Sequence, residues 1–191
     1  MTLEGMKTIL AITGGIAAFK ALGVLRLLTH HGADVYVVMT AHATQFLAPT
    51  SCAMLSGHPV SVELFAPLKT WNMEHIALAH GAELILVVPA TANFIAKLAL
   101  GIADDLLSTL CVVSAARAPL FLAPAMNTHM YTNVVVQQHL AILRQRHVEI
   151  IAPHYGRLAS TLEGQGMGRL AEPEDILAHV CAYNRRPAPS R

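Results

Sequence analysis

Short apolar segments alternate with segments of helical character along most of the chain. Five of these segments have strand length and are rich in apolar residues, namely 7–12, 34–39, 84–88, 120–123 and 149–151. Strands that alternate with helices usually form a parallel sheet with helices on both faces, because their crossovers are right-handed. We therefore expect an α/β fold, with a single-domain, doubly wound parallel sheet of five or six strands.

The composition is apolar, with 54% hydrophobic and 13% charged residues among 191. Apolar runs stop at strand length, so we expect no membrane span. A subunit that buries surface against copies of itself explains the composition better than the alternative, an unusually large core. The net charge of +1 and the absence of a basic block before the tail argue against a nucleic-acid partner.

Cysteine and histidine positions give no sign of a metal site. Cys52, Cys111 and Cys181 are far apart in apolar contexts, which predicts reduced thiols in a cytoplasmic protein. None of the eleven histidines forms His-Glu-x-x-His or pairs with cysteine at ligand spacing, so we expect no metal.

We expect one domain over residues 1–183, followed by a disordered polar tail, 184–191.

Small and polar residues follow the predicted strands, at the edge where ligands bind to open α/β sheets. Glycines and hydroxyls at 13–16 and Thr40 suit a phosphate, because backbone N–H groups can approach an anion there. A tight turn without a ligand explains the same glycines. Small residues and amides at 89–93 and 124–130 suit a flat heterocycle and a carboxylate. Position alone thus points to a mononucleotide such as a flavin.

Two motifs at this edge resemble those of the homo-oligomeric flavin-containing cysteine decarboxylases. Residues 89–93, Pro-Ala-Thr-Ala-Asn, resemble that family's Pro-Ala-Ser-Ala-Asn-Thr. Residues 124–131, Pro-Ala-Met-Asn-Thr-His-Met-Tyr, resemble its Pro-x-Met-Asn-x-x-Met-Trp, with tyrosine in the last place. The turn at 13–20, residues 101–107 and Glu74-His75-Ile76 also match, and the similarity extends over about residues 7 to 182.

The resemblance implies a Rossmann-like flavoprotein that binds FMN. It places the FMN phosphate near Thr13, Gly14, Gly15, Ile16 and Thr40, and the flavin near Phe19, Ala90, Thr91, Ala92, Asn93 and Met126. It implies that His75 moves substrate protons and that Asn127 holds the substrate carboxylate, with Met130 and Ser160 in contact with the substrate. Alone, His75 would read as a capping or solvated residue. Members are typically homotrimers or dodecamers of trimers, with the flavin site between subunits.

The chemistry of the family explains these residue types. Oxidation of a cysteine thiol to a thioaldehyde creates an electron sink β to the carboxylate, and oxidised FMN can accept the electrons. Loss of carbon dioxide then gives an enethiolate. A neutral histidine suits the proton transfer near pH 7. An uncharged amide such as Asn127 suits a carboxylate that must be lost, because a strong charge would stabilise the ground state. Asp104 and Asp105 could also be read as an acid/base pair, but we interpret them as helix N-caps.

One segment departs from the family pattern. Residues 152–168 are expected to form a long glycine-rich loop, a flap over the site. Phosphopantothenoylcysteine decarboxylases carry a cysteine in this flap, where Ser160 stands here, with about two extra residues before Arg169. A serine hydroxyl is far less acidic than a thiol. This favours an enzyme that stops at the enethiol, acting on the C-terminal cysteine of a ribosomally made precursor peptide.

Two alternatives stay open. One is a phosphopantothenoylcysteine decarboxylase of coenzyme A biosynthesis, a small-molecule enzyme with a displaced proton donor. The other is a non-catalytic flavoprotein that acts as a regulatory subunit.

Overall fold

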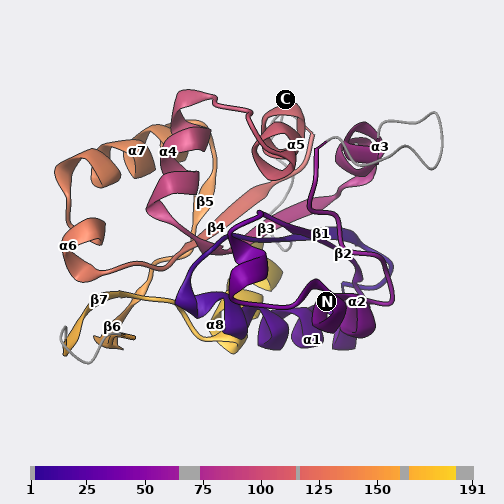
Figure 1. Ribbon diagram of the computed structural model, residues 1–191, viewed down its shortest axis with the longest axis horizontal. Helices are drawn as coiled ribbons and strands as arrows, with labels where there is room; N and C mark the ends of the chain where they lie inside the picture. Colours follow the sequence, from indigo (N-terminus) through magenta and orange to yellow (C-terminus); the bar gives the residue numbers. More distant parts are fainter. Residues whose placement is uncertain (1–2, 65–73, 115–116, 160–163, 184–191) are drawn as a thin grey trace.

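A five-stranded parallel sheet forms the centre of the molecule (Figure 1). The computed structural model describes residues 3–64, 74–114, 117–159 and 164–183, except for the side chains at 74–77. The strand order is β2-β1-β3-β4-β5, and the strands are β1 Lys7–Ile12, β2 Asp34–Met39, β3 Leu84–Ala90, β4 Leu120–Pro124 and β5 Glu149–Ile150. All four pairings are parallel. The predicted α/β fold with a doubly wound parallel sheet is confirmed.

Helices cover both faces of the sheet (Figure 1). One face packs against α1 Ala21–His30, α2 Pro49–Ser56 and α8 Pro173–Tyr183. The other packs against α3 Glu74–Gly81, α4 Ala92–Leu100, α5 Leu106–Ser114 and α7 Val134–Gln145. Alternate side chains of one strand enter the two cores: Leu10 packs with the first set of helices and Ile9 with the second. This two-sided burial explains why the strands are continuously apolar.

The helix boundaries differ from expectation where short polar side chains or a tight turn intervene. The first turn leads into a 3₁₀ helix, η1 Ile16–Lys20, before α1 begins. The sequence pattern predicts one helix from Tyr131 to His147, but the structure has two, α6 Thr128–Tyr131 and then α7. The side chain of Asn133 starts α7 by accepting a hydrogen bond from the backbone N–H of Val135 (2.9 Å). The helix expected near His42 is a 3₁₀ turn, η2 Ala43–Gln45.

One residue of the acidic pair before α5, Asp105, acts as the expected N-cap. Asp105 accepts a hydrogen bond from the backbone N–H of Ser108 (2.8 Å), which confirms its interpretation as an N-cap. Both Asp104 and Asp105 also pair with Lys97 (2.6 and 2.8 Å). Desolvation by burial acts to raise the pKa of Asp105, but the hydrogen bonds from Lys97 and Ser108 outweigh it, so the pKa is lowered.

The expectation of a long loop over residues 152–168 is wrong. Strands β6 His154–Arg157 and β7 Gln165–Arg169 pair antiparallel as a hairpin beside the main sheet (Figure 1). The glycines at 156, 166 and 168 concealed the strand pattern, since glycine is depleted in strands. Gly166 and Gly168 pack closely against the segment after β4, and Gly156 packs against Arg169 within the hairpin. The predicted tail, 184–191, and Ser160 lie outside the described residues.

All three cysteines are free thiols. Cys52 and Cys111 are buried, and Cys181 is half-buried. Burial raises the pKa of Cys111 to about 12, so this thiol stays protonated. Within the described ranges, no helix is long and apolar enough to cross a membrane.

Candidate functional site

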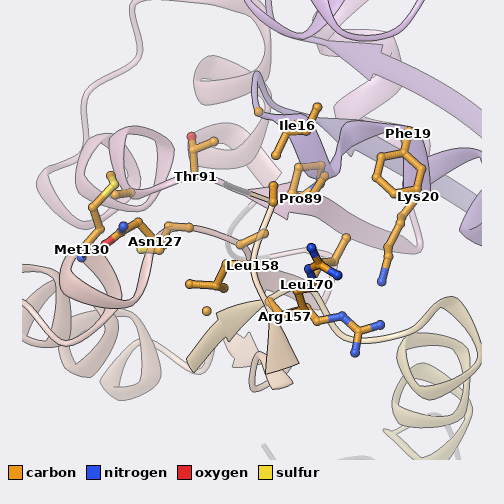
Figure 2. Close-up of a pocket in the computed structure, with 18 residues that line it drawn as sticks. Ile16, Phe19, Lys20, Pro89, Thr91, Asn127, Met130, Arg157, Leu158 and Leu170 are labelled. Carbon is orange, nitrogen blue, oxygen red and sulfur yellow. Dashed lines mark hydrogen bonds between the residues drawn. The ribbon is translucent and has the colours of Figure 1, made fainter. Parts of the chain in front are cut away.

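A pocket of about 590 Å³ opens at the carboxyl edge of the sheet (Figure 2). One wall, the strand-end wall, is formed by residues at or just after the ends of β1, β3 and β4: Gly15–Ala17, Pro89, Thr91, Ala92 and Ala125–Asn127. The facing wall, the hairpin wall, is formed by Arg157–Ala159 and Gly168–Leu170. The volume lies within the range of about 300–1,000 Å³ that is usual for small-molecule sites.

A buried hydroxyl joins the ends of β1 and β3 in the strand-end wall. Thr13 is 1% exposed and donates from Oγ1 to the carbonyl oxygen of Pro89 (2.7 Å). Its Oγ1 also accepts from the backbone N–H of Thr91 (3.2 Å). The Thr91 hydroxyl in turn caps α4 by accepting from the N–H of Phe94 (3.4 Å). The two strand ends are therefore held together by side chains that the motifs contain.

The predicted phosphate-binding residues divide into two groups. Gly15 and Ile16 line the pocket. Gly14 is not among the residues that line the pocket. A Cβ at Gly14 would overlap the Cβ of His42 and lie 2.8 Å from its carbonyl carbon. Close packing thus accounts for this glycine. Thr40 lies outside the pocket and accepts from the N–H of Ala43 (3.3 Å), while Thr13 is buried behind the wall.

The predicted flavin contacts also divide. Phe19, Thr91, Ala92 and Met126 line the pocket. Ala90 is fully buried in the sheet, and Asn93 is exposed on α4, so neither belongs to the pocket lining. Ile16 and Phe19 are 59% and 60% exposed. Apolar side chains this exposed beside a pocket are suited to contact a flat aromatic ring.

Asn127 stands where β4 ends and α6 begins. Its Oδ1 accepts from the backbone N–H groups of His129 (2.6 Å) and Met130 (3.3 Å), so Asn127 is the N-cap of α6. These bonds orient the amide, and its nitrogen carries the hydrogen-bond donors. Met130 lies beside it in the pocket lining (Figure 2). The arrangement can present N–H donors and an apolar surface to a ligand.

Two predicted residues lie outside the described part of the site. His75 is in α3, but its side chain is not among those described, and Ser160 belongs to the segment 160–163 between β6 and β7. Their roles stay predictions.

The motifs alone did not predict a charged cluster on the hairpin side of the pocket. Lys20, Arg157 and Arg169 all line the pocket. Glu172 pairs with Lys20 (2.9 Å) and with Arg169. The hydrogen bond from Lys20 is the main cause that lowers the pKa of the Glu172 carboxyl. The sequence signal was weak, because these residues are 149 positions apart at the extremes and only the fold brings them together.

Close packing seats the hairpin on the strand-end wall. The backbone N–H of Met126 donates to the carbonyl oxygen of Gly168 (3.0 Å), and the Thr128 hydroxyl donates to that of Met167 (2.8 Å). A Cβ at Gly166 would overlap Thr128 Oγ1, and one at Gly168 would overlap the carbonyl oxygen of Met126. Glycine at these two positions lets β7 lie directly against the segment that carries Asn127.

Comparison with known sequences gives a match along nearly the whole chain. The model of the family described as Flavoprotein matches residues 1–185. The coenzyme A biosynthesis bifunctional protein CoaBC of Haemophilus influenzae is 45% identical over 183 residues, which are 96% of this chain and 45% of that protein. The chain thus spans a little under half the length of this curated relative.

Comparison with solved structures agrees with the sequence match. A PPC decarboxylase, a cysteine-to-serine mutant complexed with pantothenoylaminoethenethiol, superposes with a TM-score of 0.80 and is 29% identical. The match covers 96% of this chain and 100% of that one. The FMN-dependent cysteine decarboxylase SpaF has a TM-score of 0.73 at 29% identity, over 93% of this chain and 99% of that one.

Proposed function

Because the chain belongs to the flavoprotein family, we propose that it is an FMN-dependent decarboxylase that acts on a cysteine carboxylate. The family resemblance read from the two motifs is confirmed by the match over residues 1–185. One observation carries the proposal: a single pocket brings Asn127 and Met130 together with Ile16, Thr91 and Ala92. These are residues assigned separately to the substrate and to the flavin.

The substrate that we propose is phosphopantothenoylcysteine, in place of the peptide that the sequence alone favours. A coenzyme A biosynthesis protein is 45% identical to this chain, and a PPC decarboxylase is similar over the whole of its own length. A peptide ending in cysteine stays the second candidate. The serine at position 160, where the family's phosphopantothenoylcysteine decarboxylases have a cysteine, is the observation that favours it.

The residues present fit FMN. The pocket has the right volume, backbone of Gly15 and Ile16 is available to a phosphate, and Phe19 offers an aromatic surface. When bound, FMN supplies the acceptor for the two electrons removed as the thiol becomes a thioaldehyde. Net loss of carbon dioxide alone from phosphopantothenoylcysteine would require the same two electrons, with two protons, to be returned to the enethiol.

The chain's own groups bind and orient the substrate. In our proposal the Asn127 amide donates to the substrate carboxylate, with its orientation fixed by the N-cap bonds to α6. An uncharged donor holds the carboxylate without strongly stabilising the state that must be lost. His75 takes and returns protons near the thiol and the α-carbon. Met130 packs against the apolar part of the substrate.

We also propose that the active form is a homotrimer or a dodecamer of trimers. Ile16, Phe19 and Met130 are 59%, 60% and 47% exposed around the pocket, and a neighbouring subunit would cover them. We place this assembly in the cytoplasm, where free thiols such as Cys181 stay reduced.

Mass spectrometry after incubation with FMN tests the proposal. The purified protein is given either phosphopantothenoylcysteine or a short peptide ending in cysteine. Loss of carbon dioxide alone from the first substrate is the expected result. Loss of carbon dioxide and two hydrogens from the peptide, without turnover of the first, would establish the second candidate. Binding of FMN with no turnover of either would indicate a regulatory subunit, and a protein that cannot bind FMN would refute the flavin assignments.

A further inference from the structure

One end of the pocket is cationic. Lys20 comes from η1, Arg157 from β6 and Arg169 from β7, and all three line the pocket. Figure 2 shows that Lys20 and Arg157 lie at the opposite end of the pocket from Asn127 and Met130. The pocket therefore has an amide at one end and a group of positive charges at the other.

The positive charge at this end is not balanced within the described residues. Glu172 pairs with both Lys20 (2.9 Å) and Arg169, so one carboxylate serves two cations. Among the described residues, Arg157 forms no recorded salt bridge. Three cations against one carboxylate leave an excess of two positive charges, in a chain whose net charge is only +1.

Contacts within the protein account for two of the three cations. Lys20 and Arg169 join η1 and β7 to the start of α8 through Glu172. Arg169 also packs over the backbone of β6, where a Cβ at Gly156 would lie 3.1 Å from its Cδ. No comparable contact accounts for Arg157 within the described residues. Arg157 is exposed and lines the pocket that the ligand would enter.

We propose that this cationic end binds the phosphate of the substrate, with Arg157 as its contact and with Lys20 and Arg169 held in place by Glu172. The inference rests on the proposed function and deepens it. Phosphopantothenoylcysteine carries a carboxylate at its cysteine end and a phosphate at the other end. A pocket with an amide at one end and cations at the other complements that molecule. Arginine is well suited to phosphate because its guanidinium can donate two parallel hydrogen bonds.

The phosphate of FMN is an alternative ligand for the same three cations. Of the residues that we predict for it, only Gly15 and Ile16 line the pocket, and both lie at the turn after β1. Lys20 lies at the far end of η1 from that turn, and Arg157 and Arg169 belong to the hairpin. The test therefore separates the two phosphates.

Calorimetry on the FMN-loaded protein tests the subsite without requiring turnover. The probes are pantothenate 4′-phosphate and pantothenate, which differ only in the phosphate. We expect the wild type to bind the phosphorylated probe roughly 10- to 100-fold more tightly, as charge-assisted hydrogen bonds imply. Arg157→Gln should lose most of that preference. Arg157→Lys should keep part of it, because lysine retains the positive charge but cannot donate two parallel hydrogen bonds. Arg144→Gln, which removes an exposed arginine on α7, is the control and should keep the full preference.

Four results would overturn the subsite. One is that the wild type binds the two probes with equal affinity. Another is that Arg157→Gln weakens the binding of both probes by the same factor. Weaker binding of FMN but not of riboflavin by that variant would assign the cations to the flavin phosphate. Binding of an acidic peptide ending in cysteine that depends on Arg157, without any preference for the phosphorylated probe, would assign them to a peptide. Since decarboxylation is measured separately, failure of the proposed function can be told from failure of the subsite.

Discussion

The two walls of the pocket are built in different ways. The strand-end wall continues from strands that are buried on both faces, and Thr13 links the ends of two of them through hydrogen bonds of 2.7 and 3.2 Å. The hairpin wall belongs to a separate two-stranded sheet, attached by bonds such as Met126 N to Gly168 O and by the pairs of Glu172. The first wall is supported by the core, whereas the second depends on a small number of contacts.

The difference separates the two tasks that we assign to the pocket. The strand-end wall contains part of the set predicted to contact FMN, namely Gly15, Ile16, Thr91, Ala92 and Met126, and also Asn127, which is predicted to hold the substrate carboxylate. The hairpin wall carries two of the three cations proposed to recognise the remote end of the substrate. A wall supported by the core suits the reacting groups, and a separately attached wall suits recognition of the remote end of the substrate. Substitutions in each wall should therefore fail in different ways.

The largest effect is expected in the strand-end wall, for Asn127→Asp. A carboxylate keeps the N-cap of α6, because it accepts the same hydrogen bonds from His129 and Met130. It replaces the N–H donors by a negative charge that repels the substrate carboxylate. We expect turnover to fall by at least about 1,000-fold while FMN stays bound. Turnover assays and flavin absorbance on the purified variant check this, and loss of FMN would refute the role given to Asn127.

The next effect is expected in the hairpin wall, for Gly168→Ala. This glycine has φ +121°, and a Cβ there would overlap the carbonyl oxygen of Met126. We expect the hairpin to shift, substrate affinity to fall by at least about tenfold, and the free energy of unfolding to fall by about 1–3 kcal/mol. Substrate titration and urea denaturation measure the two effects.

Gly101→Ala is the matched control for Gly168→Ala. Gly101 also has positive φ (+73°), but a Cβ there would meet nothing within 4 Å. It should show only the backbone cost of about 1–2 kcal/mol, with substrate affinity unchanged. Equal effects of the two substitutions on substrate affinity would contradict close packing of the hairpin against Met126 at Gly168.

A smaller effect is expected from the contact between Gly166 and Thr128. Gly166→Ala should destabilise the hairpin by about 1–3 kcal/mol, because its Cβ would overlap the Thr128 hydroxyl. Thr128→Ala should cost about 1 kcal/mol for the lost hydrogen bond to Met167. The double variant should be at least about 0.5 kcal/mol more stable than the sum predicts, since one change relieves the other. Additive free energies of unfolding would show that the two residues do not interact.

The smallest effect is a pH dependence that comes from Glu172. The pKa of this carboxyl is lowered below its ordinary value of 4.5, mainly by the hydrogen bond from Lys20. A lowered folded-state pKa adds stability above the unfolded-state pKa, and this stability is lost as the pH falls through the folded-state pKa. Below about pH 4.5, wild type should therefore lose more stability than Glu172→Gln. Urea denaturation between pH 7 and pH 3 measures it, with Glu174→Gln, an exposed neighbour on α8, as the control. Parallel curves for wild type and Glu172→Gln would contradict this account.

Local patterns predicted the central sheet well. Residues 7–12 and 34–39 were expected as strands and are β1 and β2 with the same bounds. In a chain where helical segments alternate with them, apolar runs of this length are best interpreted as buried strands. Glycine just after a helical segment is a local signal of the end of a helix, and Gly57 and Gly101 both adopt the left-handed conformation of a C-cap.

Other features could not be read locally. The hairpin was missed because its glycines are explained by Thr128 and Met126, which lie about 40 residues earlier in the chain. Gly14 resembled a phosphate-binding glycine, but its contact with His42 shows a packing reason that depends on the following strand. Asn127 was predicted at a strand end, and only the structure showed that its Oδ1 caps α6.

By itself, the sequence determined the order of strands and helices, the sheet edge that carries the site, and the motifs that resemble a family. These features depend on periodicity and on residues adjacent in the chain. Only the tertiary structure decided which motif residues reach the pocket, how β7 lies against Asn127, and that Lys20, Arg157 and Arg169 share one end of it. Packing and electrostatics act between groups that are close in space, and sequence separation does not report that distance.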